Sequence, residues 1–212
     1  MTQHEKVRAH VSQMILNLGI KSVRMDDVAA DLAMSKRTLY EMFGDKEELL
    51  YQSIVYLMEE RKRLMSQRVQ HCQNMLEVLL VSVRTLCVED RMGDIERRLT
   101  ANLKKFYPEI LDRAQQYHAE MGLQGLKYAL DQCRNEGYLD PYADIELMAQ
   151  LFFRSTGVMM GDMNIKMPEG VSREQAFGAL VINFLRGLSS AKGLMVIDEI
   201  LTRERSQQQD EK

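Results

Sequence analysis

The stretch "MDDVAADLAMSKRTLYEMFGDKEELL", residues 25–50, contains two short apolar runs separated by a three-residue break, Ala33–Ser35. Val28 and Leu32 are four residues apart in the first run, and Leu39 and Phe43 are four residues apart in the second. Residues at this spacing share one face of a helix. Each run therefore predicts a short helix that buries one side.

The unburied side of the second helix carries two adjacent cations and an aromatic residue, Lys36, Arg37 and Tyr40. Ser35 is placed to cap this helix by accepting a hydrogen bond from a backbone N–H of its first turn. Two short helices joined by a tight turn, with polar residues at the start of the second, form a helix-turn-helix that can enter the major groove of DNA. The alternatives are an ordinary solvated face for the cations and packing on the domain's own edge for Tyr40.

The overall charge of the chain does not itself favour nucleic acid. The 212 residues carry a formal charge of −3 at a pI of about 5.9, and 45% of them are hydrophobic. This composition is ample for a packed core. If the protein binds DNA, the positive field must be local.

Cysteine and histidine usage predicts a cytoplasmic protein without a metal, cofactor or disulfide. The three cysteines are widely spaced with no C-x-x-C pair, and the four histidines show no zinc-ligand spacing. We expect no signal peptide at the start of the chain. The apolar runs fall short of the roughly 18 residues that a membrane span requires.

Helical periodicity without sustained alternation predicts an all-α fold. We expect a helix-turn-helix domain over residues 1–47, an all-helical ligand-binding and dimerisation domain over 48–206, and a disordered polar tail over 207–212. The predicted helices span 3–18, 25–32, 36–43, 46–71, 74–91, 94–106, 108–135, 143–164, 173–190 and 193–205.

Three pieces of the opening stretch, "DDVAADLAMS", "KRTLYEMF" and "DKEELL", resemble the DNA-binding domain of the tetracycline-repressor (TetR) family of bacterial regulators. The resemblance covers roughly residues 3–52 in detail. It implies that Lys36, Arg37, Thr38 and Tyr40 contact bases or phosphates, and that Lys46 at the start of the fourth helix contacts a phosphate.

Two positions depart from the family pattern. Ala33 stands where the family usually has a glycine in the turn, although alanine disfavours positive φ. Arg24 stands where a Ser or Thr usually caps the first short helix. Because the family meets the DNA backbone there, the resemblance implies that Arg24 contributes a phosphate contact.

The predicted helix 173–190 is apolar nearly all round, so both of its faces must be covered. A second copy of the chain is the simplest cover, and the resemblance implies a four-helix dimer interface. A monomer whose last helix covers that face is the alternative. The predicted interface residues are Ile145, Met148, Phe177, Val181, Phe184 and Leu188.

Sixteen methionines suit an adaptable apolar cavity, and the family resemblance implies a small apolar or amphipathic effector. Ordinary core packing is the alternative for each candidate. Arg154 could meet an acidic ligand or form a salt bridge across the interface. The candidate ligand residues are Phe106, Tyr117, Met121, Tyr128, Phe152, Arg154 and Met159.

Together these features predict a TetR-like repressor that binds a palindromic operator as a homodimer and is released by a small molecule. An enzyme is not expected, because neither a phosphate-binding loop nor a nucleophile triad is visible in the sequence. A helical interaction module that keeps the helix-turn-helix shape without binding DNA is the alternative. It is favoured by acidic residues around the motif: Asp26, Asp27, Asp31, Glu41 and Asp45.

Overall fold

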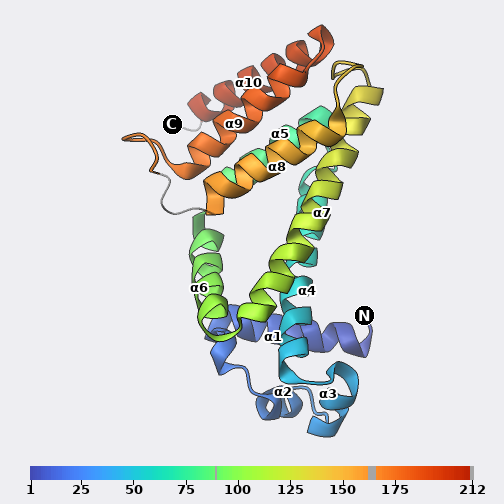
Figure 1. Ribbon diagram of the computed structural model, residues 1–212, viewed down its shortest axis with the longest axis vertical. Coiled ribbons are helices and arrows are strands. Elements are labelled where there is room, and N and C mark those ends of the chain that lie inside the picture. Colours follow the sequence, from blue (N-terminus) through green and yellow to red (C-terminus); the bar gives the residue numbers. More distant parts are fainter. Residues whose placement is uncertain (89, 162–165, 211–212) are drawn as a thin grey trace. The chain divides into compact units, whose positions relative to one another are not determined.

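The computed structural model describes the backbone of residues 1–88, 90–161 and 166–210, and the side chains of 1–82, 98–156, 166–173 and 175–203. Within that backbone the protein is all-α, with one isolated bridge between Leu139 and Ser189 (Figure 1). The predicted fold class is confirmed. The helices are α1 Gln3–Leu18, η1 Ile20–Ser22, α2 Met25–Asp31, α3 Lys36–Phe43, α4 Lys46–Arg68, α5 Met75–Val88, α6 Asp90–Phe106, α7 Pro108–Asn135, α8 Ile145–Gly161, α9 Arg173–Leu188 and α10 Ala191–Asp210.

Helix bounds agree best with the sequence where a cap or a glycine sets them. Gly19 ends α1 with φ 83° and donates its N–H to Ile15, and Gly44 ends α3 with φ 78°. Such angles are readily available only to glycine. The last helix runs further than predicted, to Asp210, through residues assigned to the disordered tail. No proline or glycine interrupts that stretch.

The chain forms two compact units. Unit 1 comprises Met1–Gln67 and Asp90–Glu120, and unit 2 comprises Arg68–Glu89 and Met121–Lys212. These compact units do not coincide with the predicted domains, which divide the chain after residue 47 by function. That functional division stays a prediction. The division within α7 has a clear physical reason in the core of unit 1.

The core of unit 1 joins the N-terminal helices to residues far along the chain. Leu103 of α6 and Ile110 and Ala114 of α7 are buried in one cluster with α1, α2, α3 and the start of α4. The first three helices therefore share their core with α6 and α7. The fully buried members from the N-terminal part are Val7, Val11, Ile20, Val23, Val28, Leu39, Leu49 and Leu50.

Unit 2 is built around α9, which contacts α5, α8 and α10 (Figure 1). The α7–α8 connection is fastened to the α9–α10 connection by two backbone bonds of 2.9 Å, from Asp140 N–H to Leu188 and from Ser190 N–H to Tyr138. At Gly193 a Cβ would lie 2.0 Å from the Tyr138 carbonyl oxygen. Only glycine permits α10 to begin so close to that backbone. No helix in the described parts of the chain is long and apolar enough to cross a membrane.

The turn between α2 and α3 forces one alanine into the left-handed region. Met34 N–H donates to Ala29 and Ala33 N–H donates to Ala30, the bond pair of a Schellman motif. This geometry gives Ala33 φ 50°, the only positive φ at a non-glycine residue among those described. The turn that a glycine would make easily is thus formed at a cost of about 1–2 kcal/mol.

We predict that Ala33→Gly raises the free energy of unfolding by about 0.5–1 kcal/mol, because relief of the left-handed strain exceeds the extra entropy of an unfolded glycine. Denaturant unfolding followed by circular dichroism measures this change. The matched control is Ala30→Gly, an exposed position inside α2, which should lower stability by a similar amount. Destabilisation by both variants would contradict the strained turn.

Candidate nucleic-acid interface

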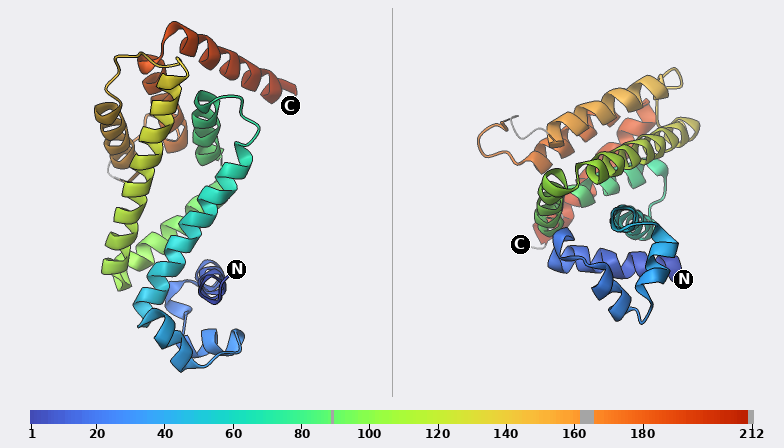
Figure 2. Two further views of the ribbon diagram at one scale, coloured as in Figure 1. Left: turned by 90° about the vertical axis from the view of Figure 1, so that its right-hand side faces the viewer. Right: turned by 60° about the horizontal axis from the view of Figure 1, so that its bottom comes forward.

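The orientation of α3 is fixed by the side chains that it buries. Leu39 is fully buried and Phe43 is 4% exposed, both in the core of unit 1. Ser35 caps the helix by accepting a 3.0 Å hydrogen bond from Thr38 N–H. Arg37 and Tyr40, on the opposite side of α3, are exposed. Figure 2 shows the short helices α2 and α3 at the end of the long helix α4 of unit 1.

Lys36 is exposed but already paired within the protein. Its Nζ lies 2.9 Å from Oδ1 and 3.1 Å from Oδ2 of Asp26, in the first turn of α2. This bond and the charge of Asp26 raise the pKa of Lys36 above its ordinary value. The pair ties the start of α2 to the start of α3, and the ammonium group would have to leave Asp26 to bind DNA fully.

Arg37 is more exposed than Lys36, with 87% of its side chain accessible. Its Nε–H donates to Oε1 of Glu41 at 2.7 Å, one helical turn later. An exposed ion pair at this spacing contributes only about 0.3–0.5 kcal/mol. Arg37 is therefore accessible to a partner outside the chain.

The other two α3 candidates lie beside the cations. Tyr40 is 42% exposed, so it does not pack fully on the edge of unit 1. The Thr38 hydroxyl lies 2.8 Å from that of Ser35, which leaves it further hydrogen-bonding capacity.

The start of α4 also carries a half-buried cation. Asp45 caps α4 by accepting a 2.8 Å bond from Glu48 N–H. The Glu48 carboxylate lies 2.9 Å from Arg113 of α7, whose guanidinium stacks 3.8 Å above Tyr51. The ammonium group of Lys46, in the first turn, lies 6.0 Å from the Tyr107 ring.

Arg24 occupies the N-cap position of α2 with extended backbone and no side-chain cap bond. Its side chain is exposed and lines a hollow of about 560 Å³ together with Lys21, Ser22, Asp27 and Asn102. As the sequence predicts, no hydroxyl caps this helix at Arg24. The cations Arg24 and Lys21 suit an anion such as phosphate, whereas the Asp27 carboxylate in the same hollow opposes one.

Most acidic residues around the motif have partners within the protein. Asp26 pairs with Lys36, Glu41 pairs with Arg37, and Asp45 caps α4. Asp31 lies 3.0 Å from Nε2 of His10 on α1. The acidic residues thus serve the local structure of unit 1 instead of forming one unpaired acidic surface.

The predicted ligand residues are distributed over both units. In unit 1, Phe106 is exposed with the Lys21 ammonium 4.0 Å from its ring, and Tyr117 O–H donates to Glu59 at 3.4 Å. In unit 2, Phe152 packs 4.5 Å from Phe184. The exposed members in unit 2 are Met121, Tyr128 and Arg154. The side chain of Met159 lies outside the described residues.

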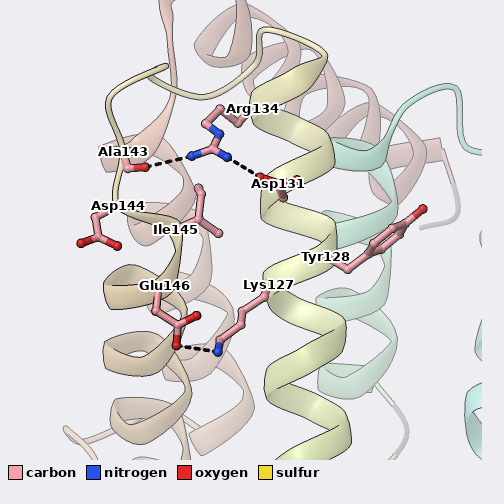
Figure 3. Close-up of a pocket in the computed structure, with 8 residues that line it drawn as sticks. All are labelled: Lys127, Tyr128, Asp131, Arg134, Ala143, Asp144, Ile145 and Glu146. Carbon is pink, nitrogen blue, oxygen red and sulfur yellow. Dashed lines mark hydrogen bonds and ion pairs between the residues drawn. The ribbon is translucent and has the colours of Figure 1, made fainter.

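A shallow pocket of about 510 Å³ lies between α7 and the start of α8 (Figure 3). Lys127 pairs with Glu146 at 2.5 Å, and Arg134 donates to Asp131 and to the Ala143 carbonyl. Tyr128, the one predicted ligand residue among those lining it, points away from these pairs. The pocket is polar, and its charged side chains other than Asp144 are paired with one another. It therefore does not match the predicted apolar cavity.

The predicted interface residues fall into two groups. Ile145 is 8% exposed and Val181 is 3% exposed, so both belong to the core of unit 2. The half-buried members are Met148, Phe177, Phe184 and Leu188. Leu147 and Leu151, one turn apart on α8, are about half exposed. Both leucines belong to the wide apolar face of the predicted helix 143–164, but they are not among the predicted interface residues.

Helices α2 and α3 thus form a helix-turn-helix with a buried core and an exposed α3 face. Residues 14–52 match the sequence model of the family described as "Bacterial regulatory proteins, tetR family". The comparison with curated proteins gave no match. The predicted TetR-family resemblance is confirmed by this match, which covers the helix-turn-helix.

Solved structures agree with this fold. A transcriptional regulator from Cytophaga hutchinsonii is 15% identical with a TM-score of 0.66, covering 88% of this chain and 98% of its own. A TetR-family regulator structure from the same species is 13% identical, with a TM-score of 0.59 and coverage of 89% and 98%. A SmeT–triclosan complex is 18% identical, with a TM-score of 0.56 and coverage of 89% and 92%. At these identities the likeness shows the fold alone.

We predict that Arg24→Ser separates stability from DNA affinity. The serine hydroxyl should cap α2 and raise the free energy of unfolding by about 1 kcal/mol. Removal of the cation should weaken binding to all DNA sequences alike and reduce the slope of log K against log salt by about 0.9 for each phosphate that Arg24 neutralises. Denaturant unfolding and fluorescence anisotropy at several salt concentrations measure the two effects. Unchanged affinity and slope would remove Arg24 from the interface.

Proposed function

We propose that this protein is a transcriptional repressor that binds a palindromic operator through α3, as a homodimer, and is released by a small molecule. The observation that carries the proposal is the accessible Arg37 and Tyr40 face, held outward by burial of Leu39 and Phe43. An α-helix carrying such side chains near its N-terminus suits the major groove. A bidentate Arg37–guanine contact would discriminate by about 1–3 kcal/mol.

The alternative is an interaction module that does not bind DNA. It was favoured by acidic residues around the motif, but most of these pair or cap within unit 1. Arg37 exposes a larger fraction of its side chain than Lys36, the other cation of α3. This arrangement supports DNA as the partner.

We predict that Arg37→Ala abolishes sequence-specific retardation of operator DNA and leaves the helical circular dichroism spectrum unchanged. The side chain contributes only a weak surface pair to the fold, whereas without its bond to guanine the operator affinity should fall about tenfold or more. Gel retardation on DNA selected by the wild-type chain measures this effect.

The matched control is Arg63→Ala, because Arg63 also forms an exposed intrahelical pair, 2.9 Å from Glu60 on α4. It removes the same charge well away from α3 and should leave specificity intact. Specific binding that persists in Arg37→Ala would contradict the assignment of α3 as the reading helix.

The homodimer is proposed to form through α8 and α9. Leu147 and Leu151 expose about half of their side chains on one face of α8, and Met148, Phe177, Phe184 and Leu188 are half buried. Apolar surface of this kind is stabilised when a second copy covers it. Two copies would place two α3 helices about one DNA turn, ~34 Å, apart, as a palindrome requires.

We predict that the double variant Leu147→Glu, Leu151→Glu is monomeric by light scattering at micromolar concentration, whereas the wild-type chain has twice the monomer mass. Burying four carboxylates in one symmetric interface would be prohibitive. The matched control Met195→Glu changes a residue 66% exposed on α10 and should remain dimeric. A monomeric wild type, or a dimeric double variant, would contradict this interface.

The effector is proposed to be a small apolar or amphipathic molecule held in the helical part of the chain. Abundant methionine supports an adaptable site, and the SmeT structure of similar fold is described as a triclosan complex. A ligand changes DNA affinity only through a different affinity for the DNA-bound and DNA-free arrangements. A molecule that binds this chain and leaves its operator affinity unchanged would not be that effector.

A further inference from the structure

The contact between Arg37 and Glu41 uses one nitrogen and one oxygen. Arg37 Nε–H donates to Glu41 Oε1 at 2.7 Å, and the Arg37 side chain makes no other hydrogen bond or ion pair within the described residues. A guanidinium group has five N–H donors in a planar fork. Four of these, on the two terminal nitrogens, remain available.

The available end of the guanidinium is the part that recognises guanine. Two parallel N–H groups from Nη1 and Nη2 can bind O6 and N7 in the major groove. Glu41 binds at the side of the group, through Nε. One guanidinium can therefore keep its bond to Glu41 while its terminal nitrogens bind a base.

Lys36 provides the contrast within the same helix. Both carboxylate oxygens of Asp26 lie within 3.1 Å of its only charged atom. An ammonium group held in this way must exchange Asp26 for DNA, and it offers no planar fork to a base. The two carboxylates of the motif thus act differently: Asp26 engages the whole charge of Lys36, whereas Glu41 leaves the reading end of Arg37 free.

The four-residue spacing of Arg37 and Glu41 on α3 fixes the direction in which Glu41 holds the arginine side chain. Residues four apart lie one above the other on the same face of a helix. Since 87% of the Arg37 side chain and 60% of the Glu41 side chain are exposed, no core packing restricts the arginine. The bond from Nε to Glu41 is the restraint that selects one orientation of a long, flexible side chain.

We infer that Glu41 is a positioning residue for base recognition: it holds Arg37 by Nε so that both terminal nitrogens face the edge of a guanine. This inference rests on the proposed function and adds a specificity determinant to it. An acidic residue on a DNA-facing helix otherwise repels phosphates or accepts from the N4 amino group of a cytosine. Its expected signature is a loss of preference at one base pair of each half-site.

Two substitutions separate the charge of Glu41 from its hydrogen bond. Glu41→Ala and Glu41→Gln each remove one negative charge, but only glutamine keeps a side-chain oxygen that can accept from Nε–H. Both variants should bind non-specific DNA about two- to threefold more tightly, because a repulsive charge near the phosphates is gone. Glu41→Ala should lose more discrimination than Glu41→Gln.

The test is selection of bound fragments from a random DNA pool, carried out with the wild-type chain and with each variant. It is followed by equilibrium competition between the selected site and its single-base substitutions. We expect Glu41→Ala to discriminate guanine about two- to fivefold less well at one base pair per half-site. Glu41→Gln should lose clearly less of this preference than Glu41→Ala, because it keeps an acceptor for Nε–H.

The matched controls are Glu60→Ala and Glu60→Gln, which break a comparable exposed pair with Arg63 on α4 and should leave every base preference unchanged. Equal loss in both Glu41 variants, or no loss in Glu41→Ala, would overturn the positioning role. Failure of the wild-type chain to bind DNA at all is a different result, since it would overturn the proposed function and this inference with it.

Discussion

Burial of Leu39 and Phe43 is the constraint on which the rest of the interface depends. These two side chains are almost inaccessible, so α3 cannot rotate about its axis without exposing apolar surface, at about 25 cal/mol per Å². The orientation of Arg37, Glu41 and Tyr40 follows from this. The helix is thus held rigidly by its buried side, while its charged side chains form only weak surface contacts. A binding helix requires such a rigid support.

The same core connects the helix-turn-helix to a distant part of the sequence. Leu103, Ile110 and Ala114 pack with the N-terminal helices, and Arg113 binds Glu48 at the start of α4. Helix α3 is therefore stabilised by α6 and by the first half of α7. Since α7 continues into unit 2, the chain that supports α3 is continuous with the chain proposed to hold an effector and a second copy.

Local signals in the sequence were sufficient for the helices and for the motif. Gly19, Ser35 and Pro108 mark helix ends that the structure places at the predicted residues, because caps and glycines act within a few residues of chain. The packing of Leu103 and Ile110 against α1–α4 joins residues far apart in the sequence, and no periodicity reveals such a partner. Ile145 and Val181 illustrate the same limit: in helices apolar on most sides, the pattern does not indicate which side faces the unit's own core. The four-residue spacing of Arg37 and Glu41 indicates an ion pair on one helix face. Only the structure shows that Glu41 binds Arg37 through Nε.

The central claim is that α3 lies in the major groove in two symmetry-related copies. Methylation interference on DNA selected by the wild-type chain tests it most directly, because methylation of guanine N7 blocks the acceptor that a groove-bound arginine uses. The account predicts interference at one or more guanines in each half-site, arranged symmetrically about the centre of the palindrome. Binding that tolerates N7 methylation at every guanine, or interference on one side only, would contradict it.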